Sequence, residues 1–120
     1  MKNNLSKPIL VTGATGYVGG RLVPKLLEKG YKVRTASRSL EKLKSRSWAN
    51  NPNVEIVVLN VFDKDSLVKA TSGCSVVYYL VHSMNALNKD FAYSDRTAAK
   101  NMASVAEAVS LEQIIYLGGL

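Results

Sequence analysis

The chain has 120 residues, 47% of them hydrophobic and 21% charged, which is the composition of one folded domain and excludes a disordered chain. Its longest apolar run, Val76 to Val81, is far shorter than the roughly 20 residues of a membrane-spanning helix, and its single cysteine, Cys74, excludes an intrachain disulfide framework or a cysteine-based zinc site. The net charge of +7 is concentrated in residues 1–50, which hold 11 basic and 2 acidic side chains, so this half is expected to attract anions unless it is simply a solvated lysine surface.

Strands and helices are predicted to alternate along the chain. Apolar runs rich in β-branched residues predict strands at 8–12, 31–37, 54–59, 75–81 and 113–117. Helical spacing of apolar residues predicts helices at 17–29, over 40–48, after a capping Asp63, and at about 89–110. This alternation requires right-handed crossovers, so we expect an α/β fold, a doubly wound parallel sheet with helices on both faces.

The first predicted helix, 17–29, follows a glycine-rich turn and ends at Gly30, which suits a C-terminal cap. Its apolar face is expected to contain Val18, Leu22, Leu26 and Leu27. Pro24 lies inside this helix, and its ring would press on the carbonyl of Gly20, where the absence of a side chain leaves room to bend. We therefore expect one kinked helix.

The turn between the first strand and the first helix has the glycine spacing G-x-x-G-x-x-G, at Gly13, Gly16 and Gly19. After the first strand of a doubly wound sheet, one glycine permits a sharp turn, a second lets the backbone approach a pyrophosphate, and a third lets the helix pack close to the strand. The amides at the helix N-terminus then offer hydrogen bonds and a partial positive charge to the phosphates. The spacing therefore predicts a dinucleotide site, the alternative being a tight turn without a ligand.

The end of the second strand distinguishes the two nicotinamide cofactors. An NAD site has an acidic residue about 20 residues after the glycines, where it binds the adenine-ribose 2′-hydroxyl, but residues 34–39 contain no acid. Arg38 can bind a 2′-phosphate, Ser37 or Ser39 can donate to it, and Arg34 can help unless strand alternation turns it elsewhere. We expect NADP rather than NAD, although a merely solvated Arg38 would also fit the sequence.

The ends of the third and fourth strands supply further candidates for cofactor contacts. Asn60 and Val61 follow the third strand, where an amide can bond to an adenine and an aliphatic side chain can pack on its face, although an ordinary strand end also fits. Leu80, Val81 and His82 end the fourth strand and would pass near the ribose beside the nicotinamide. His82 is equally compatible with a loop histidine that has no role.

The segment from Thr12 to Gly19, TGATGYVG, followed by a second strand that ends in Ser37-Arg38, resembles the short-chain dehydrogenase/reductase superfamily. More narrowly, the chain is similar to the atypical, NmrA-like, NAD(P)H-binding group, and residues 77–84, 95–101 and 114–120 are similar to a bacterial NAD(P)H-binding or epimerase-like branch. The resemblance implies a Rossmann-type sheet with the strand order 3-2-1-4-5. It also implies phosphate contacts from Gly13, Thr15, Gly16, Tyr17 and Val18, and a 2′-phosphate contact from Arg38.

Other positions show how far the resemblance extends. Asn60 stands where the family usually has an aspartate by the adenine, and Asn101 matches a long-helix asparagine that the family often uses structurally. Active members of the superfamily use a tyrosine with a lysine four residues on and a serine near the end of the fifth strand. None of the six tyrosines here has such a lysine, and the serine position reads Gly118-Gly119. We therefore expect a cofactor half-site without a recognisable catalytic group.

Three functions are compatible with these patterns. The first is an NAD(P)-binding domain of the oxidoreductase or epimerase-like type, whose chemistry would depend on residues that this chain lacks. The second is a non-catalytic NmrA-like dinucleotide sensor that regulates a protein partner. The third is nucleic-acid binding through Lys42, Lys44 and Arg46 beside Trp48, although such a basic helix is more often a solvated face.

The end of the chain just after the fifth predicted strand bears on its organisation. We expect residues 1–120 to be one Rossmann domain, the N-terminal portion of a larger protein truncated after strand five. If the chain were whole, its last strand would present an open edge for a partner chain or a second copy. The start of the sequence has no secretory signal, and the lone thiol fits a reducing compartment, so we expect a cytoplasmic protein without nucleic-acid or membrane partners.

Overall fold

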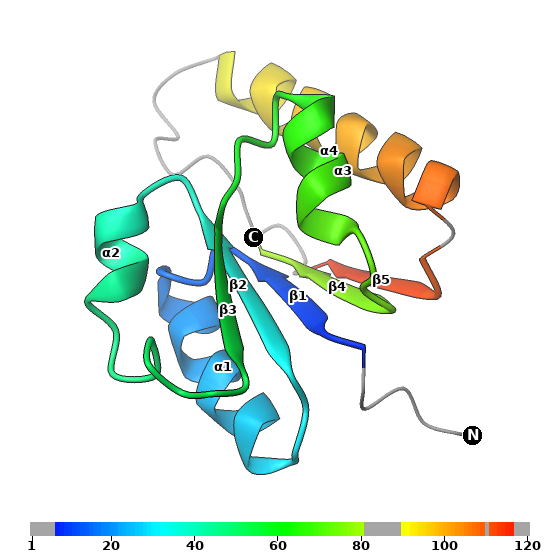
Figure 1. Ribbon diagram of the computed structural model, residues 1–120. Helices are drawn as coiled ribbons and strands as arrows, with labels where there is room; N and C mark the ends of the chain where they lie inside the picture. The colour runs from blue at the N-terminus through cyan, green and yellow to red at the C-terminus, as the bar shows by residue number, and fades with distance from the viewer. Residues whose placement is uncertain (1–6, 81–89, 110, 117–120) are drawn as a thin grey trace.

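Five parallel strands form the central sheet of the computed structural model, which describes residues 7–80, 90–109 and 111–116 (Figure 1). The strands are β1 (Ile9–Thr12), β2 (Val33–Ser37), β3 (Val54–Val58), β4 (Val76–Tyr79) and β5 (Gln113–Tyr116). The helices are α1 (Tyr17–Glu28), α2 (Leu40–Lys44), α3 (Lys64–Thr71) and α4 (Asp90–Val109). The order across the sheet is β3-β2-β1-β4-β5, which confirms the predicted Rossmann-type topology.

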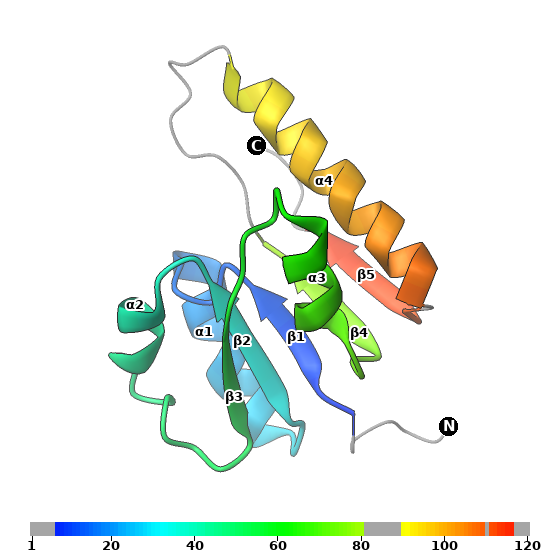
Figure 2. The ribbon, with the colours of Figure 1, turned by 45° about the horizontal axis from the view of Figure 1, so that its top comes forward.

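The helices cover both faces of the sheet, α1 and α2 on one side and α3 and α4 on the other (Figure 2). Successive side chains of β1 therefore enter different cores: Ile9 and Val11 pack with Val23 of α1, whereas Leu10 packs with Met102 of α4. Because both faces are covered, the two central strands β1 and β4 are apolar almost throughout, as buried parallel strands are, whereas β2 also carries Arg34, Thr35 and Ser37. This explains why short apolar runs predicted the strands well.

The buried face of α1 differs from the predicted one. Val18 is 40% exposed, so its assignment to the apolar face was wrong, while Val23 is fully buried and was missed. The buried residues of α1 are Gly19, Val23 and Leu26, which share one helical face, and Val18 lies outside that face. Pro24 lies inside one continuous helix, as expected, and the kink expected at this residue stays a prediction.

The helix ends follow the predicted capping chemistry. Gly30 has a φ of +90° and its amide donates to the Leu27 carbonyl, closing α1. The Asp63 side chain accepts from the amides of Asp65 and Ser66 at the start of α3. Trp48, which was expected within the second helix, lies beyond its end but is buried in the core on that face.

Several boundaries are shorter than predicted by one or two residues, as is usual for element ends. The fourth predicted strand extends to Val81, but β4 ends at Tyr79, and Val81 and His82 lie outside the described residues. Gly118 and Gly119 also lie outside them. Within the described ranges, no helix combines the length and apolar character needed to cross a membrane.

Candidate functional site

The carboxyl ends of β1, β2 and β4 meet at the glycine turn, and hydrogen bonds hold them together. The Thr12 hydroxyl donates to the Tyr78 carbonyl (3.2 Å) and accepts from the Leu80 amide (3.0 Å). On the other side, the Ala14 amide donates to the Ala36 carbonyl (3.1 Å). The turn is therefore fixed to both neighbouring strands before any ligand binds.

Two of the three motif glycines are required by the geometry of the turn. Gly13 has a φ of +67°, and a Cβ built on it would lie 3.3 Å from the backbone of Leu80. A Cβ on Gly19 would lie 2.3 Å from the Gly13 carbonyl oxygen, which is closer than real atoms approach. Gly19 thus lets α1 begin directly against the turn, the role expected of the third glycine.

The start of α1 offers hydrogen-bond donors that the described part of the chain does not use. The N-cap residue is Gly16, which provides no side-chain cap, and the first turn of the helix contains no acidic residue. By contrast, Ser39 caps α2 and Asp63 caps α3 with their side chains, and each of those helices has an acid in its first turn. The first amides of α1 and its positive dipole end are therefore available to an anion.

The turn residues differ in what they can give to such an anion. The Gly16 amide donates to the Gly13 carbonyl (2.9 Å), so it is used within the turn. Tyr17 and Val18 are the first two helical residues, and their side chains are 75% and 40% exposed. Their amides, together with that of Gly19, are the ones that helix geometry leaves without an intrahelical acceptor.

The end of β2 lies beside the glycine turn. The hydroxyls of Thr15 and Ser37 are 3.1 Å apart, and the Ser37 hydroxyl also accepts from the Ser39 amide (3.2 Å). Arg38 is exposed, and Ser39 uses its own side chain to cap α2. The structure therefore brings Thr15 and Ser37 together, with Arg38 next along the chain.

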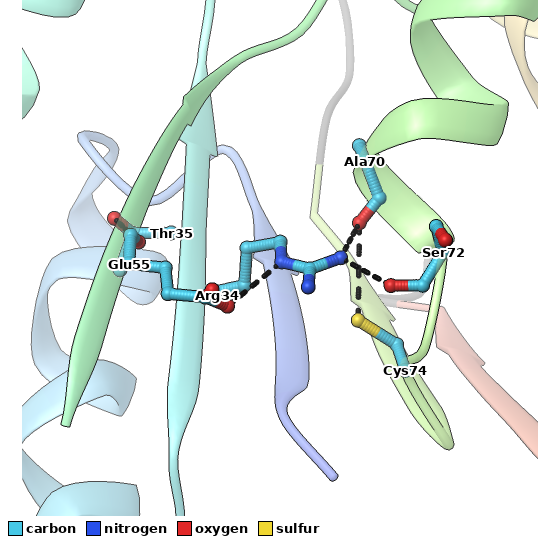
Figure 3. A network of polar contacts seen from close by, with 6 residues as sticks. All are labelled: Arg34, Thr35, Glu55, Ala70, Ser72 and Cys74. Atoms are coloured by element: carbon cyan, nitrogen blue, oxygen red, sulfur yellow. Dashed lines mark hydrogen bonds and ion pairs between the residues drawn. The ribbon is translucent and has the colours of Figure 1, made fainter.

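Arg34 is directed away from this edge. Its Nη1 donates to the carbonyls of Ala70 (2.7 Å) and Ser72 (2.6 Å), and its Nε pairs with Oε1 of Glu55 (3.0 Å; Figure 3). The guanidinium thus serves the last carbonyls of α3, at the other end of the strand. Of the two placements that the sequence left open for Arg34, alternation turning it elsewhere is the one observed.

Cys74 lies in the same group of contacts as Arg34, with its Sγ 3.8 Å from the Ala70 carbonyl (Figure 3). Burial raises the pKa of the Cys74 thiol; the nearby Arg34 guanidinium opposes this increase and the Glu55 carboxylate adds to it. A thiol with a raised pKa is mostly protonated at neutral pH and is a poor nucleophile. The described residues contain no cluster of side chains that would hold a metal ion.

The residues after β3 divide between the loop and the core. Asn60 is exposed, and its Oδ1 accepts from the Phe62 amide (3.0 Å), so the carbonyl end of its amide holds the loop. Val61 is 5% exposed and its side chain packs in the core, while its carbonyl accepts from Nδ2 of Asn101 (3.2 Å). Asn101 therefore has a structural contact, as the resemblance implied.

The sequence did not predict where Arg46 lies. This residue follows α2, and its Nη2 donates to the carbonyl of Thr15, 31 positions earlier in the chain. An open pocket of about 340 Å³ is lined by Thr15, Gly16, Tyr17, Gly20, Arg21 and Arg46. From the sequence, Arg46 belongs with Lys42, Lys44 and Trp48 to a candidate nucleic-acid surface. Trp48, however, is buried and presents no ring for stacking. No local spacing in the sequence signals a contact over such a separation.

Comparison with known proteins agrees with this geometry. Residues 13–120 match the model of a family described as NAD(P)H-binding. An NmrA-like family domain-containing protein from Dictyostelium discoideum is 33% identical over 78% of this chain and 32% of its own length. A bifunctional dihydroflavonol 4-reductase/flavanone 4-reductase from Malus domestica is 33% identical over 71% of this chain and 26% of its own.

Solved structures give the same fold. Yeast methylglyoxal/isovaleraldehyde reductase Gre2, complexed with NADPH, superposes with a TM-score of 0.77 and 20% identity, covering 91% of this chain and 36% of that one. The chain spans between a quarter and a third of the length of the curated relatives compared. The family match nevertheless extends over the glycine turn and every element after it, so the chain belongs to the NAD(P)H-binding family.

Proposed function

We propose that this chain binds NADP at the glycine turn, as the cofactor-binding part of a reductase- or epimerase-like protein. The observation that carries the proposal is the uncapped, acid-free start of α1. A pyrophosphate there would accept hydrogen bonds from the amides of Tyr17 and Val18 and would be attracted by the helix dipole. The family match supports a nicotinamide dinucleotide as the ligand.

The preference for NADP over NAD is argued from the end of β2. An acidic residue there would bind the ribose 2′-hydroxyl of NAD and repel a 2′-phosphate, but positions 37–39 are Ser, Arg and Ser. The exposed Arg38 can bind the 2′-phosphate through charge-assisted hydrogen bonds, and the Ser37 hydroxyl faces the same edge beside Thr15. This part of the proposal concerns the choice between two cofactors of one class.

The other predicted contacts complete the cofactor site. The exposed Asn60 is suited to the adenine edge through its amide nitrogen. Val61 follows it, with its side chain in the core and its carbonyl bonded to Asn101. Leu80, held by Thr12 at the end of β4, would lie near the ribose beside the nicotinamide. Gly13 and Gly19 take part by shaping the turn.

Calorimetric titration with NADP and NAD, side by side, tests the proposal. Wild type should bind both, and Gly16→Val should lose binding, because a side chain there would project beside the first helical amides. Gly16 has a φ of −82°, which valine can adopt, but its Cβ would lie 3.3 Å from the Gly13 carbonyl oxygen and the turn must shift slightly. A circular dichroism spectrum and a thermal melt that match the wild-type chain therefore accompany the titration. Ala108→Val, at an exposed position of α4, is the matched control. Unchanged affinity in Gly16→Val would refute the pyrophosphate assignment.

A second function, a non-catalytic dinucleotide sensor, is favoured by the NmrA-like relative. The sequence also lacks a tyrosine with a lysine four residues on. A sensor would bind NADPH without oxidising it, whereas a reductase would consume NADPH absorbance when given a carbonyl compound. We expect binding without turnover from residues 1–120. Whether these residues are the N-terminal part of a longer protein stays a prediction.

A further inference from the structure

Arg46 is a partly buried arginine that has no carboxylate partner among the residues that the structure describes. Its Nη2 donates to the Thr15 carbonyl, and its Nε is buried without any hydrogen-bond acceptor among the described residues. The ion pair found in the described part of the chain belongs to Arg34 and Glu55, not to Arg46. Burying a charge without a counter-charge costs free energy, and an anion bound beside it would offset that cost.

Arg34 shows what an arginine with a purely structural role looks like in this protein. Its Nη1 donates to the carbonyls of Ala70 in α3 and Ser72 just after it, and its Nε pairs with a carboxylate, so these donors are used by the fold itself (Figure 3). Among the described residues, the Arg46 guanidinium has one hydrogen-bond acceptor, the Thr15 carbonyl, and its buried Nε has none. The fold therefore uses fewer hydrogen-bond donors of the Arg46 guanidinium than of the Arg34 guanidinium.

The position of Arg46 places its unused hydrogen-bond donors next to the end of β2. Thr15 connects the two sides: its hydroxyl lies 3.1 Å from that of Ser37, and its carbonyl accepts from Arg46. Arg46 also lines the pocket over the glycine turn together with Arg21, which stacks on the Tyr17 ring at 4.5 Å. None of the described residues that line this pocket is acidic, and two of them are arginines, so their charge is positive.

We propose that Arg46 is a second basic residue for the 2′-phosphate of NADP, acting across Thr15 from Ser37 and Arg38. The Thr15 carbonyl anchors one nitrogen of the guanidinium, and Nη1, which lies toward Gly20 and the pocket, donates to the phosphate. The proposal rests on the proposed dinucleotide site and adds a selectivity residue from a segment outside the glycine motif and β2. Two guanidinium groups on one phosphate would raise the preference for NADP beyond what Arg38 provides alone.

Affinities of NADP and NAD for wild type, Arg46→Met and Arg46→Lys test this role. Arg46→Met keeps most of the side-chain volume and removes the charge, so NADP binding should weaken about 10- to 100-fold, the worth of a charge-assisted hydrogen bond. NAD binding should weaken several-fold less than NADP binding, because NAD lacks the 2′-phosphate and retains only the pyrophosphate that both dinucleotides place at the glycine turn. Arg46→Lys, which keeps the charge without the planar fork, should fall between wild type and Arg46→Met for NADP. Lys25→Met, on the exposed last turn of α1, removes one positive charge far from the turn and serves as control.

The possible results separate this proposal from the one on which it rests. If wild type binds neither dinucleotide, the proposed function itself fails. If wild type binds both and Arg46→Met loses NADP and NAD affinity equally, Arg46 only shapes the glycine turn and the selectivity role is refuted. An Arg46→Met variant that binds NADP as wild type does would refute it as well. Thermal melts of each variant show whether the chain remains folded.

Discussion

The hydroxyls of Thr15 and Ser37 lie 3.1 Å apart, joining the middle of the glycine turn to the last residue of β2. These residues belong to the two segments from which a dinucleotide's pyrophosphate and its adenosine ribose would be bound. Together with the Ala14–Ala36 backbone bond, this contact fixes the spacing between the two half-sites. Preorganisation of this kind lowers the entropy that a ligand must lose on binding.

Removing the Ser37 hydroxyl should therefore lower the free energy of unfolding even without a ligand. Ser37→Ala deletes the bond to Thr15 and the bond to the Ser39 amide, and we expect the free energy of unfolding to fall by about 1–2 kcal/mol. Ser45→Ala removes a single exposed hydrogen bond to the nearby Lys42 carbonyl and should change the free energy of unfolding by less than about 0.5 kcal/mol. Urea unfolding of both variants measures the difference. Equal losses would mean that the Thr15–Ser37 bond contributes nothing measurable.

Arg38→Ala should weaken NADP binding much more than NAD binding, because only NADP carries the 2′-phosphate. We expect a loss of about 10- to 100-fold for NADP, the worth of hydrogen bonds to a charged group. Arg38 is exposed, so the fold should be unaffected. Lys69→Ala, in the last turn of α3, is a control for the loss of one positive charge. Equal losses for NADP and NAD in the titration would show that Arg38 does not choose between them.

The third motif glycine should act through the fold rather than through direct ligand contact. A Cβ at position 19 would stand 2.3 Å from the Gly13 carbonyl oxygen, so Gly19→Ala must move α1 or the turn. Overpacking of this kind typically costs about 1–3 kcal/mol, and we expect a loss of stability in that range. At Gly20 the nearest atoms would lie 3.7 Å and 3.8 Å away, so Gly20→Ala should be tolerated. If the two variants unfold at the same urea concentration, the close approach at Gly19 is not rigid.

Arg34 should matter for stability and not for cofactor choice. Arg34→Met removes two charge-assisted bonds to the end of α3, and we expect a loss of about 2–4 kcal/mol. Glu55→Gln should cost under about 1 kcal/mol, because the Glu55 side chain is 59% exposed and its ion pair is screened by solvent. The ratio of NADP to NAD affinity should stay at the wild-type value in both variants. A changed affinity ratio in Arg34→Met would indicate that Arg34 contacts the 2′-phosphate.

The sequence was a good guide wherever structure depends on neighbours along the chain. The capping of α3 by Asp63 and the end of α1 at Gly30 are local, and each was predicted from residue type and spacing. The parallel sheet followed from the alternation of apolar runs, since right-handed crossovers leave few topologies. The glycine turn could be placed because its spacing has meaning only between a strand and a helix.

Contacts between distant segments could not be predicted in this way. The helical period placed Val18 on the apolar face, but the face that packs in the core contains Gly19, Val23 and Leu26 and leaves Val18 exposed. Arg34 and Arg46 look alike in sequence, yet one reaches the end of α3 and the other the glycine turn. In both arginines the partner is a backbone carbonyl more than 30 positions away, and such a partner leaves no trace in local composition.

The raised pKa of the Cys74 thiol predicts a pH dependence of stability. Burial is the main cause, with Arg34 lowering the pKa and Glu55 raising it to smaller extents, so the folded chain holds this proton to higher pH than the unfolded chain does. The contribution of the neutral thiol is therefore present in full below the unfolded pKa, and it is lost as the pH rises through the ordinary value of 9.0 toward the folded value.

We expect the free energy of unfolding of wild type to fall more steeply than that of Cys74→Ala between about pH 8 and about pH 10. Urea unfolding at several pH values measures both slopes, and lysine and tyrosine titrations, common to both proteins, cancel in the difference. Parallel curves would show that the Cys74 thiol is as accessible to solvent in the folded chain as in the unfolded one.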